Sequence, residues 1–130
     1  MSAASPPALS AEDRAALAAG IAQFNDGLFY ECHDTLEEVW SGVRGPSRDF
    51  LQGLIQVAVG FYHLGNGNRA GATTLLRRAL LRLERYPGRT AGVDLGPLRE
   101  GVREWLAALE SGAPVPDRPP RIGMAEGGEG

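Results

Sequence analysis

The chain has 130 residues, of which 43% are hydrophobic, and carries a formal net charge of −3. This length fits one domain with a single core, and a weakly acidic chain has no overall attraction to nucleic acid or to an anionic membrane surface. The one cysteine, Cys32, cannot form an internal disulfide, and residues 1–10 lack the apolar segment of a secretory signal. We therefore expect a cytoplasmic protein with no membrane span and no nucleic-acid partner.

Helix-breaking residues divide the chain into five predicted helices and leave no predicted strand. Ser10, with Asp13 three residues later, is typical of a helix N-terminus. Pro46 and Pro97 are typical first-turn residues, and Gly112 is a typical terminator. The predicted helices cover residues 11–24, about 28–41, 46 or 47 to about 64, 69 to about 85, and 97–111.

The fold class expected from these elements is all-α, with about five antiparallel helices in a compact bundle of helical hairpins. Short connections favour antiparallel neighbours. The stretch 50–64 is apolar nearly all the way round, which predicts a central, most buried helix. Gly53 and Gly60 lie seven residues apart on one face of it, so we expect another helix to approach closely there.

The domain organisation expected from composition has three parts. Residues 1–9 are predicted to be a flexible N-terminal arm and residues 10–112 a single all-helical domain. Residues 113–130 are rich in proline and glycine, a composition that disfavours regular structure, so this tail is expected to be mostly disordered.

Polar side chains interrupt the apolar faces of the second and third predicted helices. His33 lies within the stripe formed by Phe29, Leu36 and Trp40, and Glu37 lies at the edge of that stripe. On the third helix the interruptions are Gln52, Gln56 and His63. An uncompensated buried polar group costs roughly 1–3 kcal/mol, so these groups are expected to bind one another, a water or a ligand. The i, i+4 spacing predicts a contact between His33 and Glu37.

Three sequence blocks carry a resemblance to a known family. They read FNDGLFYECHD at 24–34, LEEVW at 36–40 and FLQGLIQ at 50–56. The chain resembles the domain of unknown function 309 family over roughly residues 24–85. The resemblance implies a small all-helical fold and no particular activity. It also implies six characteristic polar and aromatic positions, which are His33, Glu37, Trp40, Gln52, Gln56 and His63.

Three interpretations of these six residues stay open at the level of sequence. They form a pocket for a small ligand, a closed hydrogen-bond network that fixes helix register, or a metal site made by His33, Glu37 and His63. The paired Glu-x-x-His elements of di-iron bundles are absent, which weighs against a metal. Two functions correspond to these interpretations. In the first, the protein binds a small molecule or a metal, with or without catalysis. In the second, it is a helical-hairpin module that binds another protein. The pattern identifies no cofactor, enzyme class or oligomeric state.

Two other features receive structural interpretations. Cys32 and His33 are adjacent on a helix and point about 100° apart, so they do not form a catalytic dyad. A buried structural thiol is expected instead. The arginine series on the fourth helix is interpreted as a solvated outer face. Its members are Arg77, Arg78, Arg82, Arg85 and Arg89.

Overall fold

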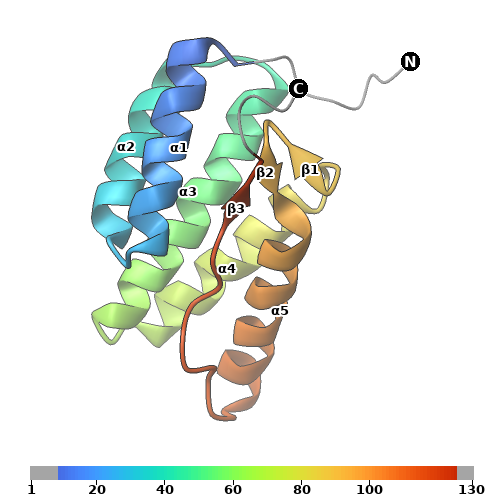
Figure 1. Cartoon of the computed structure of the whole chain (residues 1–130). Helices are drawn as coiled ribbons and strands as arrows, with labels where there is room; N and C mark the ends of the chain where they lie inside the picture. The colour runs from blue at the N-terminus through green and yellow to red at the C-terminus, as the bar shows by residue number, and fades with distance from the viewer. Residues whose placement is uncertain (1–8, 126–130) are drawn as a thin grey trace.

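The computed structural model describes residues 9–125 and has a helical bundle arranged around one central helix (Figure 1). In chain order the helices are α1 (Ala11–Asn25), α2 (Phe29–Gly42), α3 (Pro46–Gly65), α4 (Arg69–Leu83) and α5 (Leu95–Ser111). α3 packs against both α2 and α4, while α1 packs on α2 and α5 packs on α4. Consecutive helices reverse direction along the chain, as helical hairpins do. The predicted all-α fold class is therefore confirmed.

Helix boundaries follow capping chemistry that can be read in the sequence. The Ser10 hydroxyl accepts a hydrogen bond from the backbone N–H of Asp13 at 3.0 Å, which confirms the predicted start of α1. Asn68 caps α4 in the same way, through the N–H of Gly71 at 2.9 Å. α5 ends where Gly112 takes the left-handed conformation, with φ 77°.

α3 is the most buried helix, as predicted. Phe50, Leu51, Leu54 and Val57 are at most 1% exposed, and full burial of such a side chain contributes roughly 1.5–3 kcal/mol. The close approach predicted at its glycines is also confirmed. A Cβ built on Gly53 would lie 2.7 Å from Leu83 Cδ2, and one on Gly60 would lie 2.9 Å from Leu76 Cδ2, both on α4.

A small antiparallel sheet overturns the expectation that the chain has no strand. Its strands are β1 (Arg89–Thr90), β2 (Val93–Asp94) and β3 (Gly123–Met124), paired in the order β1-β2-β3. Ala91 and Gly92 join β1 to β2 with φ 52° and 80°, and two positive φ values are typical of a type I′ hairpin turn. Strands of two residues are too short to show the alternation by which sequence analysis recognises a strand.

The segment after α5 also differs from the expected unstructured tail. It runs back beside α5 and reaches β2, where Gly123 pairs with Asp94 (Figure 1). Ile122 is 4% exposed, and the side-chain amide of Asn25 both donates to its carbonyl at 2.9 Å and accepts from its N–H at 2.8 Å. A buried apolar side chain with a satisfied backbone explains why these residues have a defined place despite the nearby prolines.

The predicted N-terminal arm overlaps the core at its last residue. Leu9 is 8% exposed and packs with the hydrophobic core. Residues 1–8 of that arm and residues 126–130 of the tail lie outside the described residues. Within residues 9–125, no helix combines the length and apolar character needed to cross a bilayer.

Candidate functional site

Two antiparallel helices bring the motif blocks together. α2 and α3 pack side by side, and the short connection at residues 43–45 places the end of α2 beside the start of α3. Glu37 and Trp40 lie three residues apart on α2 and therefore share one flank of that helix. Gln52 of α3 faces the same space, and the three side chains line one cavity.

This cavity, called the Trp40 cavity, has a volume of about 430 Å³ and a charged wall. The residues that line it are Glu37, Trp40, Gly45, Arg48, Asp49, Gln52 and Arg82. Two arginines and two carboxylates contribute to the wall, so its formal charges cancel. Such a wall can contact both an anionic group and a hydrogen-bond donor of a polar ligand, because each charge of the wall favours an opposite charge or dipole.

Arg48 caps the C-terminal end of α2. Its guanidinium carbon lies 3.7 Å from the centroid of the Trp40 ring. Its Nη1 donates to the carbonyl oxygens of Trp40 at 3.0 Å and Val43 at 3.1 Å. Both contacts are favourable, since a cation is stabilised over an indole face and near a helix C-terminus. Within residues 9–125 Arg48 forms no ion pair, so its charge is available to a ligand.

Arg82 enters the cavity wall from α4 and is held by side chains of α3. It forms an ion pair with Asp49, and its Nε donates to Oε1 of Gln56 at 3.2 Å. Asp49 also accepts from Arg85 Nη1 at 3.1 Å. Gln56 is 7% exposed, and Arg82 gives its buried amide the partner that such a group requires. This network joins α3 to α4.

Gln52 and Glu37 keep hydrogen-bonding capacity. Gln52 is half-buried, and its amide makes no hydrogen bond within the part of the chain that the structure describes. The Glu37 side chain is 52% exposed, and its Oε2 lies 3.4 Å from Nε2 of His33. That distance confirms the predicted contact between His33 and Glu37.

A second, smaller depression lies near the other end of the same helix pair. This aromatic hollow has a volume of about 120 Å³ and is lined by Tyr30, His33, Val59, Tyr62 and His63. The rings of Tyr30 and Tyr62 have centroids 5.5 Å apart, and those of Tyr30 and His33 lie 5.6 Å apart. Its wall is therefore made mainly of ring faces.

The six predicted residues do not form one buried cluster, which corrects the expectation of a single polar group on buried helix faces. Glu37, Trp40 and Gln52 line the Trp40 cavity, His33 and His63 line the aromatic hollow, and Gln56 belongs to the Arg82 network. Of these six, only Gln56 is buried. The other five side chains are at least partly exposed, although Nδ1 of His33 is buried and has no hydrogen-bond partner among residues 9–125.

The three weak metal candidates do not share a site. Glu37 lines the Trp40 cavity, whereas His33 and His63 line the aromatic hollow. His63 Nδ1 lies 3.5 Å from Asn68 Nδ2, an amide nitrogen rather than a metal-binding atom. Among residues 9–125 there is no group of three His, Cys, Asp or Glu side chains that could hold a metal ion.

Cys32 is a buried thiol with a structural environment. It is 1% exposed on the inner side of α2. Burial raises the pKa of its thiol from 9.0 to about 12, partly offset by a hydrogen bond to the backbone of Phe24. A thiol that stays protonated at neutral pH is a poor nucleophile, in agreement with the structural interpretation made from the sequence.

Sequence analysis missed three charged residues of the Trp40 cavity. Arg48 and Gln52 are spaced i, i+4 on α3, and this spacing was a usable signal for a shared flank. Asp49 could be assigned to the site only from the packing of α4 against α3, because its partner Arg82 is 33 residues away in sequence. The sequence interpretation placed Arg82 on a solvated face, whereas it is partly buried against α3.

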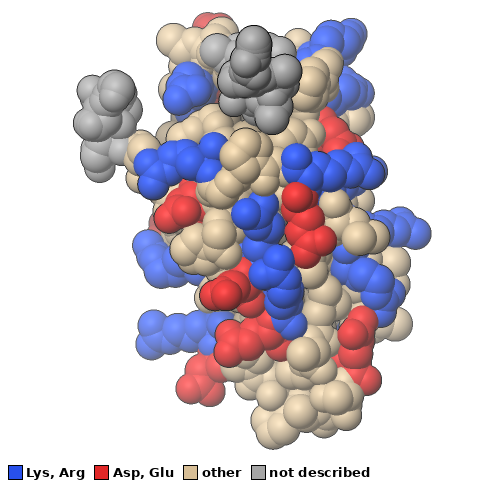
Figure 2. All heavy atoms as spheres, turned by 90° about the vertical axis from the view of Figure 1, so that its right-hand side faces the viewer, with Lys and Arg blue, Asp and Glu red and all other residues tan. Residues whose placement is uncertain are grey.

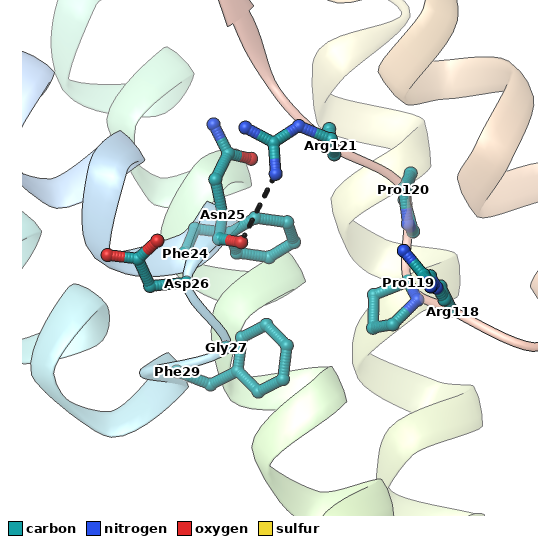
Figure 3. Close-up of a pocket in the computed structure, with 9 residues that line it drawn as sticks. All are labelled: Phe24, Asn25, Asp26, Gly27, Phe29, Arg118, Pro119, Pro120 and Arg121. Carbon is teal, nitrogen blue, oxygen red and sulfur yellow. Dashed lines mark hydrogen bonds between the residues drawn. The ribbon is translucent and has the colours of Figure 1, made fainter.

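A further cavity of about 270 Å³ lies where the C-terminal segment crosses the turn between α1 and α2 (Figure 3). Arg118 to Arg121 face Asn25 to Gly27 across it, and Arg121 Nη1 donates to the Asn25 carbonyl at 3.4 Å. The Asn25 amide is already occupied by Ile122. We interpret this cavity as space left beneath the crossing segment.

The α4 and α5 side of the molecule carries mixed charge. Figure 2 shows acidic and basic side chains next to one another on this face. Arg77 pairs with Glu110 at 2.5 Å, and Arg103 pairs with Glu84 at 3.1 Å. Acidic partners therefore interrupt the arginine series on this face.

Comparison with known proteins agrees with the resemblance drawn from the motifs. Residues 17–75 match the family model described as "Domain of unknown function (DUF309)". An uncharacterized protein of Aquifex aeolicus (strain VF5) is 32% identical over 92 residues, which cover 70% of this chain and 28% of the relative. The uncharacterized protein YpuF of Bacillus subtilis (strain 168) is 36% identical over 86 residues, covering 64% and 49% respectively.

The resemblance to this family is thus confirmed, and these matches support no specific function. The matched region spans about half or less of each relative's length. Any activity must therefore be inferred from the residues of the site.

Proposed function

We propose that this protein binds a small polar molecule in the Trp40 cavity. One observation supports this above all others: Glu37, Trp40 and Gln52, from two separate blocks of the motif, line one cavity of about 430 Å³. Side chains that serve only to fix two helices against each other normally satisfy one another. Here Gln52 makes no hydrogen bond within residues 9–125 and faces the cavity.

The wall suggests the chemistry of the ligand. Arg48 has no carboxylate partner among the described residues, and its guanidinium can donate to a carboxylate or another oxyanion. Glu37 can accept from an ammonium, amide or hydroxyl group, and Gln52 can donate and accept. A zwitterion or a hydroxylated acid satisfies this set, because it carries both an anionic group and a donor.

Binding is proposed rather than catalysis. The lining of the Trp40 cavity contains no serine, cysteine or histidine that could act as a nucleophile or a neutral-pH base. The alternative of a purely structural polar core applies to Gln56 and Arg82, whose side chains satisfy each other. It does not account for Gln52.

We also propose a cytoplasmic location and no nucleic-acid partner. A buried reduced thiol at Cys32 fits a reducing compartment. The mixed charge of the α4 and α5 face and the net charge of −3 both disfavour a polyanion.

The test uses the fluorescence of Trp40. Trp40 and Trp105 are the two tryptophans, so a Trp105→Phe background leaves Trp40 as the reporter. Free amino acids, hydroxycarboxylic acids and polyols are titrated one at a time. We expect a saturating change with a zwitterion or hydroxy acid, and Gln52→Ala and Glu37→Ala should each weaken it about tenfold or more.

Glu38→Ala is the matched control, because Glu38 is the exposed neighbour of Glu37 and does not line the cavity. It should leave the affinity unchanged. Absence of any saturating response across the three classes would overturn the proposal. A response that survives both cavity substitutions would also overturn it.

A further inference from the structure

We infer that the outer flank of α2, together with the end of α3, binds a basic segment of a partner polypeptide. The aromatic hollow receives one lysine or arginine side chain, which packs against the rings of Tyr30 and Tyr62. Asp34, one helical turn beyond Tyr30, pairs with a second cation of the same segment.

Exposed apolar side chains mark this end of the molecule. Among residues 9–125 the exposed large hydrophobics are Leu28, Tyr30, Tyr62 and Leu81, at 45%, 54%, 39% and 61%. The first three lie at the start of α2 or the end of α3, which are neighbours because the two helices are antiparallel. A cluster of exposed aromatic surface of this kind is typical of a binding site.

Charge complementarity selects a basic partner. Residues 26–43 contain five carboxylates and no arginine or lysine. Of the five, only Glu37 has an ionic partner within the described residues, and that partner is His33. Tyr30, Asp34 and Glu37 follow one another at i, i+4 and i+7, so they lie along one flank of α2. The faces of Tyr rings attract cations, and the carboxylates beside them reinforce this preference.

The size of the hollow favours a side chain of a longer chain. A volume of about 120 Å³ holds the tip of one side chain and leaves no room for a folded element. A single cation–π contact at an exposed position is weak. Useful affinity therefore requires further contacts along the α2 flank, which an extended segment supplies and a free small cation does not.

This inference does not rest on binding in the Trp40 cavity. The two depressions share no lining residue, although the His33–Glu37 pair lies between them. The test therefore uses Tyr30, Tyr62 and Asp34 and leaves Glu37 unchanged, so that failure of one proposal can be distinguished from failure of the other.

The experiment measures fluorescence anisotropy of a short labelled peptide of alternating arginine and glycine, with the full chain as titrant. We expect saturable binding whose affinity falls as salt is raised, because the contacts are between exposed charges. The double variant Tyr30→Ala, Tyr62→Ala should weaken binding about tenfold, and Asp34→Asn about threefold. Tyr30→Phe keeps the ring and should bind nearly as well as the wild type.

Matched controls come from the opposite side of the molecule. Leu81→Ala on α4 removes an exposed apolar side chain, and Glu104→Gln on α5 removes an exposed carboxylate. Both should leave the affinity unchanged, and melting temperatures should show that every variant is folded. The inference is overturned if the peptide does not bind, or if a glutamate–glycine peptide binds equally well. Binding of methylguanidinium as tightly as the peptide would overturn it too, in favour of a small-cation site.

Discussion

Gln56 lies where α3 and α4 meet, and its Oε1 accepts from Arg82 Nε at 3.2 Å. Gln56→Ala leaves this donor with one partner fewer in a partly buried position. We expect the free energy of unfolding to fall by about 1–3 kcal/mol and the melting temperature by several degrees. Thermal unfolding followed by circular dichroism measures both.

Gln52→Ala and Glu37→Ala are the comparisons for that experiment. Gln52 lies one turn earlier on the same helix and has no hydrogen bond within residues 9–125 to lose. The Glu37 side chain is 52% exposed, and an ion pair at an exposed position contributes at most about 1 kcal/mol. If Glu37→Ala is the most destabilising of the three while no probe binds, the cavity should be assigned a structural role.

At the residue scale, the contact that the sequence predicted correctly is local. His33 and Glu37 meet because residues at i and i+4 are neighbours on any helix. Arg82 could not be assigned to the site in this way, since its meeting with Asp49 depends on the rotation of α4 against α3. Periodicity fixes which face of a helix is apolar, but it does not fix which polar edge of one helix meets which edge of another.

At the scale of elements, the separation of α3 and α4 depends on two glycines. A Cβ on Gly53 would lie 2.7 Å from Leu83 Cδ2 and 3.4 Å from Arg82 Cβ. Gly53→Ala must therefore displace the fully buried Leu83, and we expect a loss of about 1–3 kcal/mol in chemical denaturation. Gly65→Ala, at the end of the same helix with nothing within 4 Å of the new Cβ, should be neutral or stabilising by up to about 1 kcal/mol.

A Gly53→Ala variant as stable as Gly65→Ala would show that α4 shifts freely and that its packing distance is not set by Gly53. The approach itself was predictable from the seven-residue spacing of Gly53 and Gly60. The identity of the neighbouring helix was not predictable, because the glycine spacing indicates a close approach without indicating which element makes it. The β-sheet was missed for a different reason: each strand has only two residues, and the pairing of β2 with β3 joins residues about 30 positions apart.

At the scale of the whole molecule, the C-terminal segment links the two ends of the bundle. The segment leaves α5 at Gly112. Farther along the segment, the Arg118 carbonyl accepts a hydrogen bond from Trp105 Nε1 at 3.2 Å. It then crosses the turn between α1 and α2 and ends in β3 (Figures 1 and 3). Helical periodicity predicts no such path, since the residues that anchor it are single contacts spread along the chain.

Asn25 is the main polar anchor of this crossing. Its side-chain amide forms two hydrogen bonds with the backbone of Ile122, one donated at 2.9 Å and one accepted at 2.8 Å. Asn25→Ala removes both and leaves the Ile122 N–H and carbonyl without these partners. We expect a loss of about 1–3 kcal/mol in stability. Trypsin cleavage after the exposed Arg121 should accelerate several-fold, because the segment opens more often.

Asn66→Ala is the control for this prediction, since Asn66 is an exposed turn residue whose side chain has no hydrogen bond within residues 9–125. It should change neither stability nor the rate of cleavage. If Asn25→Ala lowers stability while cleavage after Arg121 stays at the wild-type rate, Asn25 stabilises only the end of α1. If both change together, Asn25 couples the first helix hairpin to the C-terminal segment, and the FNDG block of the motif has a structural role separate from the Trp40 cavity.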